Sequence, residues 1–185
     1  MTKILTILLL FTIVACGQTT TTEESTTKSK KEVAGWETFS GNHYTIQYPP
    51  DWNLNTSGQM GTEFILFSPL EDEKDLFKEN INLLIQDLTG RNIDMKTFIE
   101  ISEEQVKTLI TNSNLIESTR MKDSNLEYHK MIYSGDQGKY SLMFEQYLCI
   151  IDEKAYILTF TCKQETYSEY KKMGEKILNS FFIRE

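Results

Sequence analysis

The sequence predicts an α+β protein in which helices cover a central antiparallel β-sheet. Alternating apolar and polar residues, the pattern of half-buried strands, dominate the chain from about residue 44. Short turn sequences between neighbouring strands indicate hairpins, which join antiparallel strands. Two segments with helical spacing of apolar residues interrupt or follow the strands. This order of elements is typical of helices packed on an antiparallel sheet.

Length and composition are those of an ordinary globular protein. The 185 residues are 39% hydrophobic and 25% charged, which excludes collagen-like, low-complexity and polytopic membrane proteins. The 19 Lys and Arg residues against 27 Asp and Glu give a net charge of −8. This sign opposes binding to phosphates, so we expect no nucleic-acid partner.

Residues 1–15 have the pattern of a bacterial lipoprotein signal peptide. Lys3 precedes an apolar run from Ile4 to Val14, which is too short for a membrane span of about 20 residues. The run from Ile13 to Cys16 resembles the bacterial lipobox, in which the cysteine thiol is acylated. We therefore expect Cys16 to carry a lipid anchor, including palmitate, on the outer side of the cell membrane or on the outer membrane. A plain secretory signal is the alternative.

Residues 16–34 are predicted to be the lipidated cysteine and a flexible tether. Between residues 17 and 33 the chain is rich in threonine, serine, lysine and glutamate and has no aromatic residue. Such a segment buries too little apolar surface to offset the entropy of ordering. A single domain is then expected over residues 35–185.

The strands of this domain are predicted from period-two patterns and from the residues that end them. The first strand stops at Pro49 and Pro50, because proline removes the hydrogen-bond donor that a sheet needs. The expected strands are Tyr44–Tyr48, Phe64–Phe67, Asn80–Leu88, Leu115–Met121 and Leu126–Ser134.

Two hairpins follow. Gly135–Gly138 supplies turn residues between Met131–Tyr133 and Tyr140–Phe144. Asp152–Lys154 separates Tyr147–Ile151 from Ala155–Thr161. Consecutive hairpins predict an antiparallel meander.

The first helix is predicted to begin after Asp94, a favourable N-cap residue, and to end at about Thr111. Ser102 and Gln105 form a competing capping box that would mark a kink. The residues expected on its inner side are Phe98, Ile101, Val106, Leu109 and Ile110.

The second helix is predicted to begin at the capping box formed by Thr166 and Glu169. Apolar residues then recur at helical spacing and predict one buried face. These residues are Tyr167, Tyr170, Gly174, Ile177, Leu178 and Phe181.

No sequence motif indicates catalysis, a metal site or a cofactor. The chain has two histidines, His43 and His129, and lacks the nucleophile elbow and the zinc-binding spacings. The segment from Gly135 to Tyr140 resembles a phosphate loop only superficially, because its glycines are too close together. We therefore expect a protein that is not an enzyme and binds no metal.

Cys149 and Cys162 are predicted to be buried free thiols. A hairpin that turned midway between them would place the turn inside an apolar run. With the turn near Glu153, the two cysteines are several residues out of register, much farther apart than the roughly 7 Å that a disulfide allows between Cα atoms.

A partner surface is the remaining site hypothesis. Trp52 follows a strand end and could be a binding anchor, because tryptophan is over-represented in binding hot spots, or it could pack over the turn. Asp51 lies beside it. The acidic residues Glu71, Asp72 and Glu73 lie in a predicted solvated loop, for which a weak calcium site is the alternative.

Structural residues spread over the domain carry a family resemblance. They are Tyr44-Thr45-Ile46, Tyr48-Pro49, Trp52, Phe67-Ser68, Asn80-Ile81-Asn82, Gln86-Asp87-Leu88, Ala155 through Thr161, Ile177-Leu178 and Ser180-Phe181. Over about residues 36–185 this pattern resembles the PsbP-like superfamily, which includes Mog-type Ran-binding proteins and small bacterial lipoproteins. The resemblance implies an α/β/α sandwich and a non-enzymatic binding or assembly role. Photosystem function is not implied, because the photosynthetic members use a specialised N-terminal segment that is a threonine-rich linker here.

Three functions compete. The first is a membrane-tethered module that docks onto another envelope protein or assists an assembly. The second is a small-ligand or metal carrier, in which some of the 9 Tyr, 10 Phe and 2 Trp residues line a pocket. The third is an enzyme without a recognisable motif. An open pocket with converging polar groups would favour the second and third.

Overall fold

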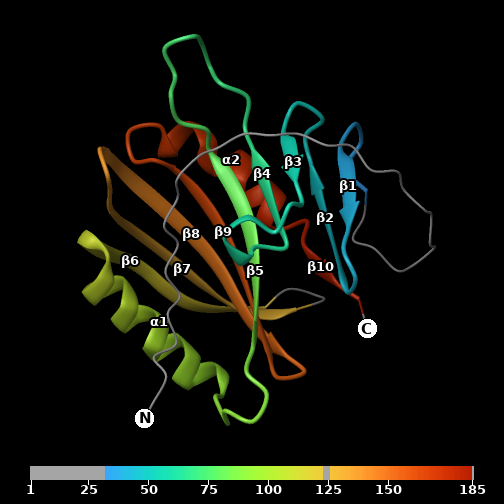
Figure 1. The fold of residues 1–185 in the computed structure, drawn as a ribbon, viewed down its shortest axis with the longest axis vertical. Helices are drawn as coiled ribbons and strands as arrows, with labels where there is room; N and C mark the ends of the chain where they lie inside the picture. Colours follow the sequence, from blue (N-terminus) through green and yellow to red (C-terminus); the bar gives the residue numbers. More distant parts are fainter. Residues whose placement is uncertain (1–31, 123–125, 185) are drawn as a thin grey trace.

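The computed structural model describes residues 32–122 and 126–184, which form two antiparallel sheets and two α-helices (Figure 1). The predicted signal peptide, Cys16 and most of the tether lie outside the described residues. The elements are β1 (Glu37–Ser40), β2 (Tyr44–Tyr48), β3 (Asn53–Asn55), the 3-10 turn η1 (Gln59–Gly61), β4 (Phe64–Phe67), β5 (Asn80–Asp87), α1 (Met95–Leu109), β6 (Thr111–Lys122), β7 (Glu127–Gln137), β8 (Tyr140–Ile151), β9 (Lys154–Lys163), α2 (Tyr167–Leu178) and β10 (Phe182–Ile183). None of the described helices is long and apolar enough to cross a membrane.

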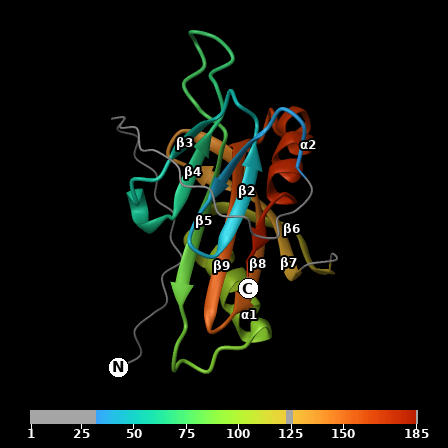
Figure 2. The same cartoon turned by 90° about the vertical axis from the view of Figure 1, so that its right-hand side faces the viewer.

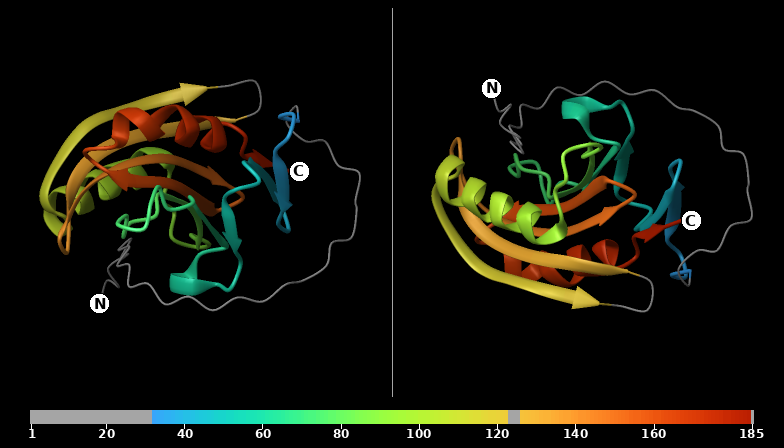
Figure 3. Two further views of the ribbon diagram at one scale, coloured as in Figure 1. Left: turned by 90° about the horizontal axis from the view of Figure 1, so that it is seen from above. Right: turned by 90° about the horizontal axis from the view of Figure 1, so that it is seen from below.

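The larger sheet has the strand order β3-β4-β5-β9-β8-β7-β6, and the smaller one has the order β1-β2-β10. The small sheet lies on the side of the molecule opposite to β6 and α1 (Figure 1). Strands β6 and β7 are long and bent, so the large sheet curls at this edge (Figure 3). The predicted antiparallel sheet is confirmed, whereas the short strands β1, β3 and β10 were not predicted.

The turn predicted over Gly135–Gly138 is shorter in the structure, because β7 continues to Gln137 and β8 begins at Tyr140. Gly135 therefore lies within a strand. A Cβ atom at this position would collide with the side chain of Ile110, the residue between α1 and β6. Glycine here permits the close approach of that connection to β7.

The hairpin between β8 and β9 turns at Asp152 and Glu153, whose φ angles of 49° and 56° match the hand of hairpin turns. In this register Cys149 faces Tyr156, and Cys162 faces Met143. Both thiols are free and buried, as predicted. Burial raises the pKa of the Cys149 thiol to about 12 and also raises that of Cys162, so both stay protonated.

Side chains that alternate along the central strands give the large sheet two separate apolar cores. Tyr156, Leu158 and Phe160 of β9 pack into one core, together with Ile177 and Leu178 of α2. Ala155 and Ile157 of β9 pack into the other core, which contains Phe98 and Val106 of α1. The two helices therefore cover opposite faces of the sheet, each over part of its area.

Helix α2 packs closely on its face of the sheet. A Cβ atom at Gly174 would lie 2.6 Å from the ring of Phe160, so only glycine allows this approach. The helix begins where it was predicted to begin, but the capping box is wrong: Thr166 makes no side-chain cap. Its hydroxyl instead donates to Oε1 of Glu79, a buried carboxyl, at 3.3 Å.

Ion pairs also link α2 to the face of the large sheet that it covers. The Glu145 carboxylate is fully buried, 3.2 Å from the Lys130 ammonium, which also lies 3.4 Å from Glu175 of α2. Burial raises the pKa of Glu145. For Lys130 burial lowers the pKa, but the neighbouring carboxylates outweigh this effect and raise it. The two groups therefore form a compensated pair.

Helix α1 begins as predicted, because the Asp94 side chain accepts a hydrogen bond from the Thr97 amide. Its inner side differs from the prediction: Ile99 and Ser102 are buried in place of Ile101, and Leu109 is 48% exposed. The predicted kink is also wrong. The Ser102 hydroxyl donates to the Phe98 carbonyl within a continuous helix.

Replacing Gly174 by alanine should destabilise the protein, although alanine favours helix formation. The overpacking against Phe160 costs about 1–3 kcal/mol, whereas the gain in helix propensity is about 1 kcal/mol. We expect a lower midpoint of urea unfolding for Gly174→Ala. The exposed substitution Lys172→Ala is the control and should change stability by less than about 0.5 kcal/mol. An unchanged or higher midpoint for Gly174→Ala would show that α2 does not pack as described.

Candidate functional site

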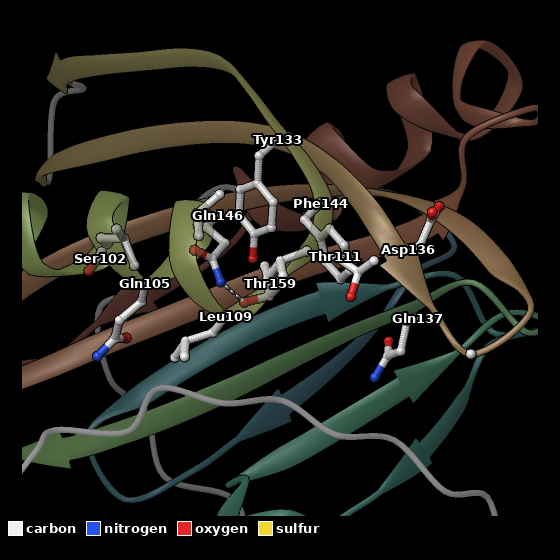
Figure 4. A pocket seen from close by; sticks show the side chains of 14 residues that line it. Ser102, Gln105, Leu109, Thr111, Tyr133, Asp136, Gln137, Phe144, Gln146 and Thr159 are labelled. Atoms are coloured by element: carbon white, nitrogen blue, oxygen red, sulfur yellow. Dashed lines mark hydrogen bonds between the residues drawn. The ribbon is translucent and has the colours of Figure 1, made fainter.

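A cavity of about 280 Å³ lies between the C-terminal half of α1 and strands β7, β8 and β9 (Figure 4). Its volume is close to the lower end of the range for small-molecule sites, which is about 300–1,000 Å³. The apolar part of its lining comprises Val106, Leu109, Ile110, Phe144 and Leu148, and its polar part includes Ser102, Gln105, Tyr133, Gln146 and Thr159.

The cavity follows from the residues on the inner side of α1. Ser102 and Gln105 occupy positions that line the sheet-facing side of the helix, where larger apolar side chains would fill the space. The opposing strands also carry polar residues there, in a core that is otherwise apolar. The helix therefore closes on the sheet near Phe98 but leaves a hollow towards Leu109.

Gln146 and Thr159 form a polar pair on the sheet side of the cavity. They are partners in the register of β8 and β9, and only 6% and 1% of their surfaces are exposed. The Gln146 Nε2 atom donates to the Thr159 Oγ1 atom at 3.1 Å (Figure 4). This bond holds the NH₂ end of the Gln146 amide.

Tyr133 supplies a third buried polar group. Its ring stacks on Phe144 with the centroids 4.8 Å apart, which fixes its orientation. Its hydroxyl points towards Gln146 and Thr159 (Figure 4). Within residues 32–122 and 126–184 no hydrogen bond of this hydroxyl to the protein is found, and the oxygen opens onto the cavity, although Tyr133 as a whole is only 5% exposed. Burial raises the pKa of the hydroxyl, so it stays a neutral donor.

Asp136 is the one charged residue in the described lining of the cavity. It accepts hydrogen bonds from Ser141 and Asn112, each at 2.6 Å, and these bonds lower the pKa of its carboxyl group. The lining thus carries a carboxylate and no cationic side chain. An anionic ligand would meet no compensating charge there.

The residues predicted as a partner surface lie elsewhere. Of the two alternatives for Trp52, a binding anchor or packing over the turn, the structure favours packing: the side chain is 6% exposed and lies in the α2-side core. Asp51 is exposed on the turn beside it. A buried indole next to an exposed carboxylate does not form the surface anchor that the sequence suggested.

The acidic residues Glu71, Asp72 and Glu73 are exposed in the long loop between β4 and β5, which projects beyond the sheet (Figures 1 and 2). Glu71 accepts a hydrogen bond from the Tyr170 hydroxyl at 2.9 Å. The Asp72 side chain accepts hydrogen bonds from the backbone amides of Lys74 and Asp75 in its own loop. Two of the three acidic side chains therefore stabilise the loop and its contact with α2.

The described residues contain no group of three or more His, Cys, Asp or Glu side chains that could hold a metal ion. One serine and one histidine do meet. The Ser118 hydroxyl donates to Glu103 of α1 and lies 2.7 Å from Nε2 of His129. In a catalytic triad the histidine lies between the serine and the carboxylate. Here the serine is in the middle, and its proton is directed at the carboxylate.

The cavity residues were not identified as a site from the sequence. Ser102 and Gln105 were interpreted as a capping box, and Tyr133 as part of an ordinary strand. The available signal was the presence of polar residues at inward positions of otherwise apolar elements, namely Ser102 in the helix and Gln146 and Thr159 in the strands. Their convergence depends on the register of three strands.

Comparisons with known proteins agree on the fold. A family model described as PsbP-like protein matches residues 2–183. A search of curated protein sequences gives no significant match.

Among solved structures, cyanobacterial PsbP from Synechocystis is similar, with a TM-score of 0.59, 13% identity, and coverage of 85% of this chain and 98% of that one. LpqN of Mycobacterium tuberculosis, described as involved in cell envelope biogenesis, gives a TM-score of 0.61, 11% identity, and coverage of 81% and 91%. The Pseudomonas aeruginosa protein PA94, of unknown function, gives a TM-score of 0.59 and 10% identity, with coverage of 82% of this chain and 99% of that one. At such identities the likeness shows a shared fold.

Proposed function

The chain belongs to the PsbP-like protein family, and on this basis we propose that it is a lipid-anchored binding protein of the bacterial cell envelope. Its domain binds a small ligand in the cavity under α1 and catalyses no reaction. The lipobox-like run ending at Cys16 supports the anchor, and the tether holds the domain away from the membrane. The envelope role of the similar LpqN structure supports the location.

The observation that carries the ligand-binding function is the convergence of buried polar groups on a cavity. Tyr133, Gln146 and Thr159 come from three neighbouring strands and are each less than a tenth exposed. A hydroxyl that faces a cavity and has no protein partner there is available to a ligand that accepts a hydrogen bond. This favours a small-ligand carrier over a module that only docks onto proteins, and it favours an organic ligand over a metal ion.

Docking onto another envelope protein is the second candidate function. The exposed acidic loop with Glu71, Asp72 and Glu73 supports it, because a projecting charged loop suits a basic partner surface. Trp52 no longer belongs to this hypothesis, since it is buried. The absence of a nucleophile motif and the order of groups around Ser118 support a non-catalytic function for either candidate.

Replacing Cys16 by serine tests the anchor. Without a thiol to acylate, the Cys16→Ser chain should move from the membrane fraction to the soluble fraction of the cell. Fractionation followed by immunoblotting measures this shift. If the variant still sediments with membranes after a high-salt wash, attachment does not depend on a lipid at Cys16.

Closing the mouth of the cavity tests the ligand-binding function. Leu109 lines the cavity and is half exposed, so Leu109→Trp should block entry and leave the core intact. In the detergent-free Cys16→Ser background, octan-1-ol should raise the melting temperature in a saturable way, as a ligand of the native state does. The rise should disappear in Leu109→Trp.

The matched control is Leu76→Trp, which places the same side chain on an exposed loop position outside the cavity. It should respond to octan-1-ol as the parent chain does. Equal responses from the two tryptophan variants would contradict binding under α1. If, in addition, an envelope partner is recovered equally well with both variants, docking becomes the better account.

A further inference from the structure

The polar groups of the cavity define the chemistry of its ligand, and this inference rests on the ligand-binding function proposed above. The Tyr133 hydroxyl is held by stacking on Phe144 and has no protein acceptor among the described residues. A ligand atom that accepts a hydrogen bond would satisfy it. Because this hydroxyl opens onto the cavity, it is available to a ligand that supplies an acceptor.

Gln146 adds the complementary requirement. One hydrogen of its Nε2 atom is donated to Thr159, and no bond of its Oε1 atom is found within the described residues. A ligand atom that donates a hydrogen bond would satisfy this oxygen. The Thr159 hydroxyl can either donate or accept a hydrogen bond. The Gln146 amide in the reverse orientation would therefore bond to Thr159 through its oxygen and present its NH₂ group to the ligand instead. A ligand group with both a donor and an acceptor fits either orientation.

The charge of the lining limits the ligand further. Asp136 is the one ionised side chain among the described residues of the lining, and it already has two hydrogen bonds from Ser141 and Asn112. A carboxylate or phosphate on the ligand would lose its hydration without meeting a cation among the described lining residues, which is unfavourable in a cavity. A neutral polar group does not carry this cost.

The size of the cavity and its apolar walls define the rest of the molecule. Cavities of about 150 Å³ with apolar walls bind benzene, so 280 Å³ accommodates on the order of ten non-hydrogen atoms. Val106, Leu109 and Leu148 line the cavity beside the polar groups and would contact an aliphatic or aromatic body.

We propose that the cavity takes an uncharged amphiphile whose amide or hydroxyl group bonds at once to the Tyr133 hydroxyl and the Gln146 side chain. The apolar part of this ligand lies along α1 and reaches the mouth at Leu109. Tyr133 and Gln146 are its specificity-determining residues.

Three probes of equal size test the ligand class: octanamide, which has a donor and an acceptor; methyl heptanoate, which has acceptors only; and octanoate, which is charged. Affinity for the detergent-free Cys16→Ser chain is measured by NMR titration. Octanamide should bind about fivefold more tightly than methyl heptanoate, the ratio for one hydrogen bond of about 1 kcal/mol. Octanoate should bind more weakly than either.

Tyr133→Phe removes the hydroxyl and keeps the ring that stacks on Phe144. It should weaken octanamide binding about fivefold, whereas the melting temperature of the free protein should stay about the same, because the hydroxyl makes no hydrogen bond to the described protein residues. Tyr140→Phe is the matched control, since the Tyr140 hydroxyl bonds to the Leu76 carbonyl outside the cavity. It should leave octanamide affinity unchanged.

The outcomes separate the two proposals. The ligand class would be overturned if all three probes bind with equal affinity, or if Tyr133→Phe leaves the affinity for octanamide unchanged. Either result would still leave the cavity as a binding site. If no probe binds in a way that Leu109→Trp abolishes, the ligand-binding function itself is wrong.

Discussion

The alternation of side chains along β8 and β9 is the constraint on which the rest of the structure depends. Both strands lie in the middle of the large sheet, so successive residues enter opposite cores. Each core needs its own cover, and the chain provides one helix for each face. The buried thiols, the ion pair beneath α2 and the cavity beneath α1 all follow from which face a residue of these strands enters.

The two faces are closed to different degrees. On one face, Gly174 brings α2 into contact with Phe160, and the Lys130–Glu145 pair is enclosed under the helix. On the other face, Ser102 and Gln105 of α1 line a cavity together with Gln146 and Thr159 of the sheet. The α2 face is thus the more tightly closed of the two. The α1 face retains a hollow and unpaired polar groups, features that reduce stability but suit ligand binding.

Local signals predicted much of the fold but not the site. Proline ended β2 where expected, and the Asp94 cap placed the start of α1, because both effects act within a few residues. The strands β1, β3 and β10 were missed since they are short and depend on distant partners for pairing. For Trp52 two alternatives stayed open, a surface anchor or packing over the turn, because the sequence shows only its turn; the structure buries the side chain. The cavity depends on the register of β7, β8 and β9, which places Tyr133 and Gln146 together.

Native mass spectrometry of the Cys16→Ser chain, released from its own cells without detergent, is the most direct test of the occupied cavity. The account predicts that part of the protein carries one additional small molecule, which denaturation releases and which Leu109→Trp lacks. Added octanamide should then form a one-to-one complex with the parent chain only. A single unliganded mass for both proteins, with octanamide bound equally by both or by neither, would contradict the account.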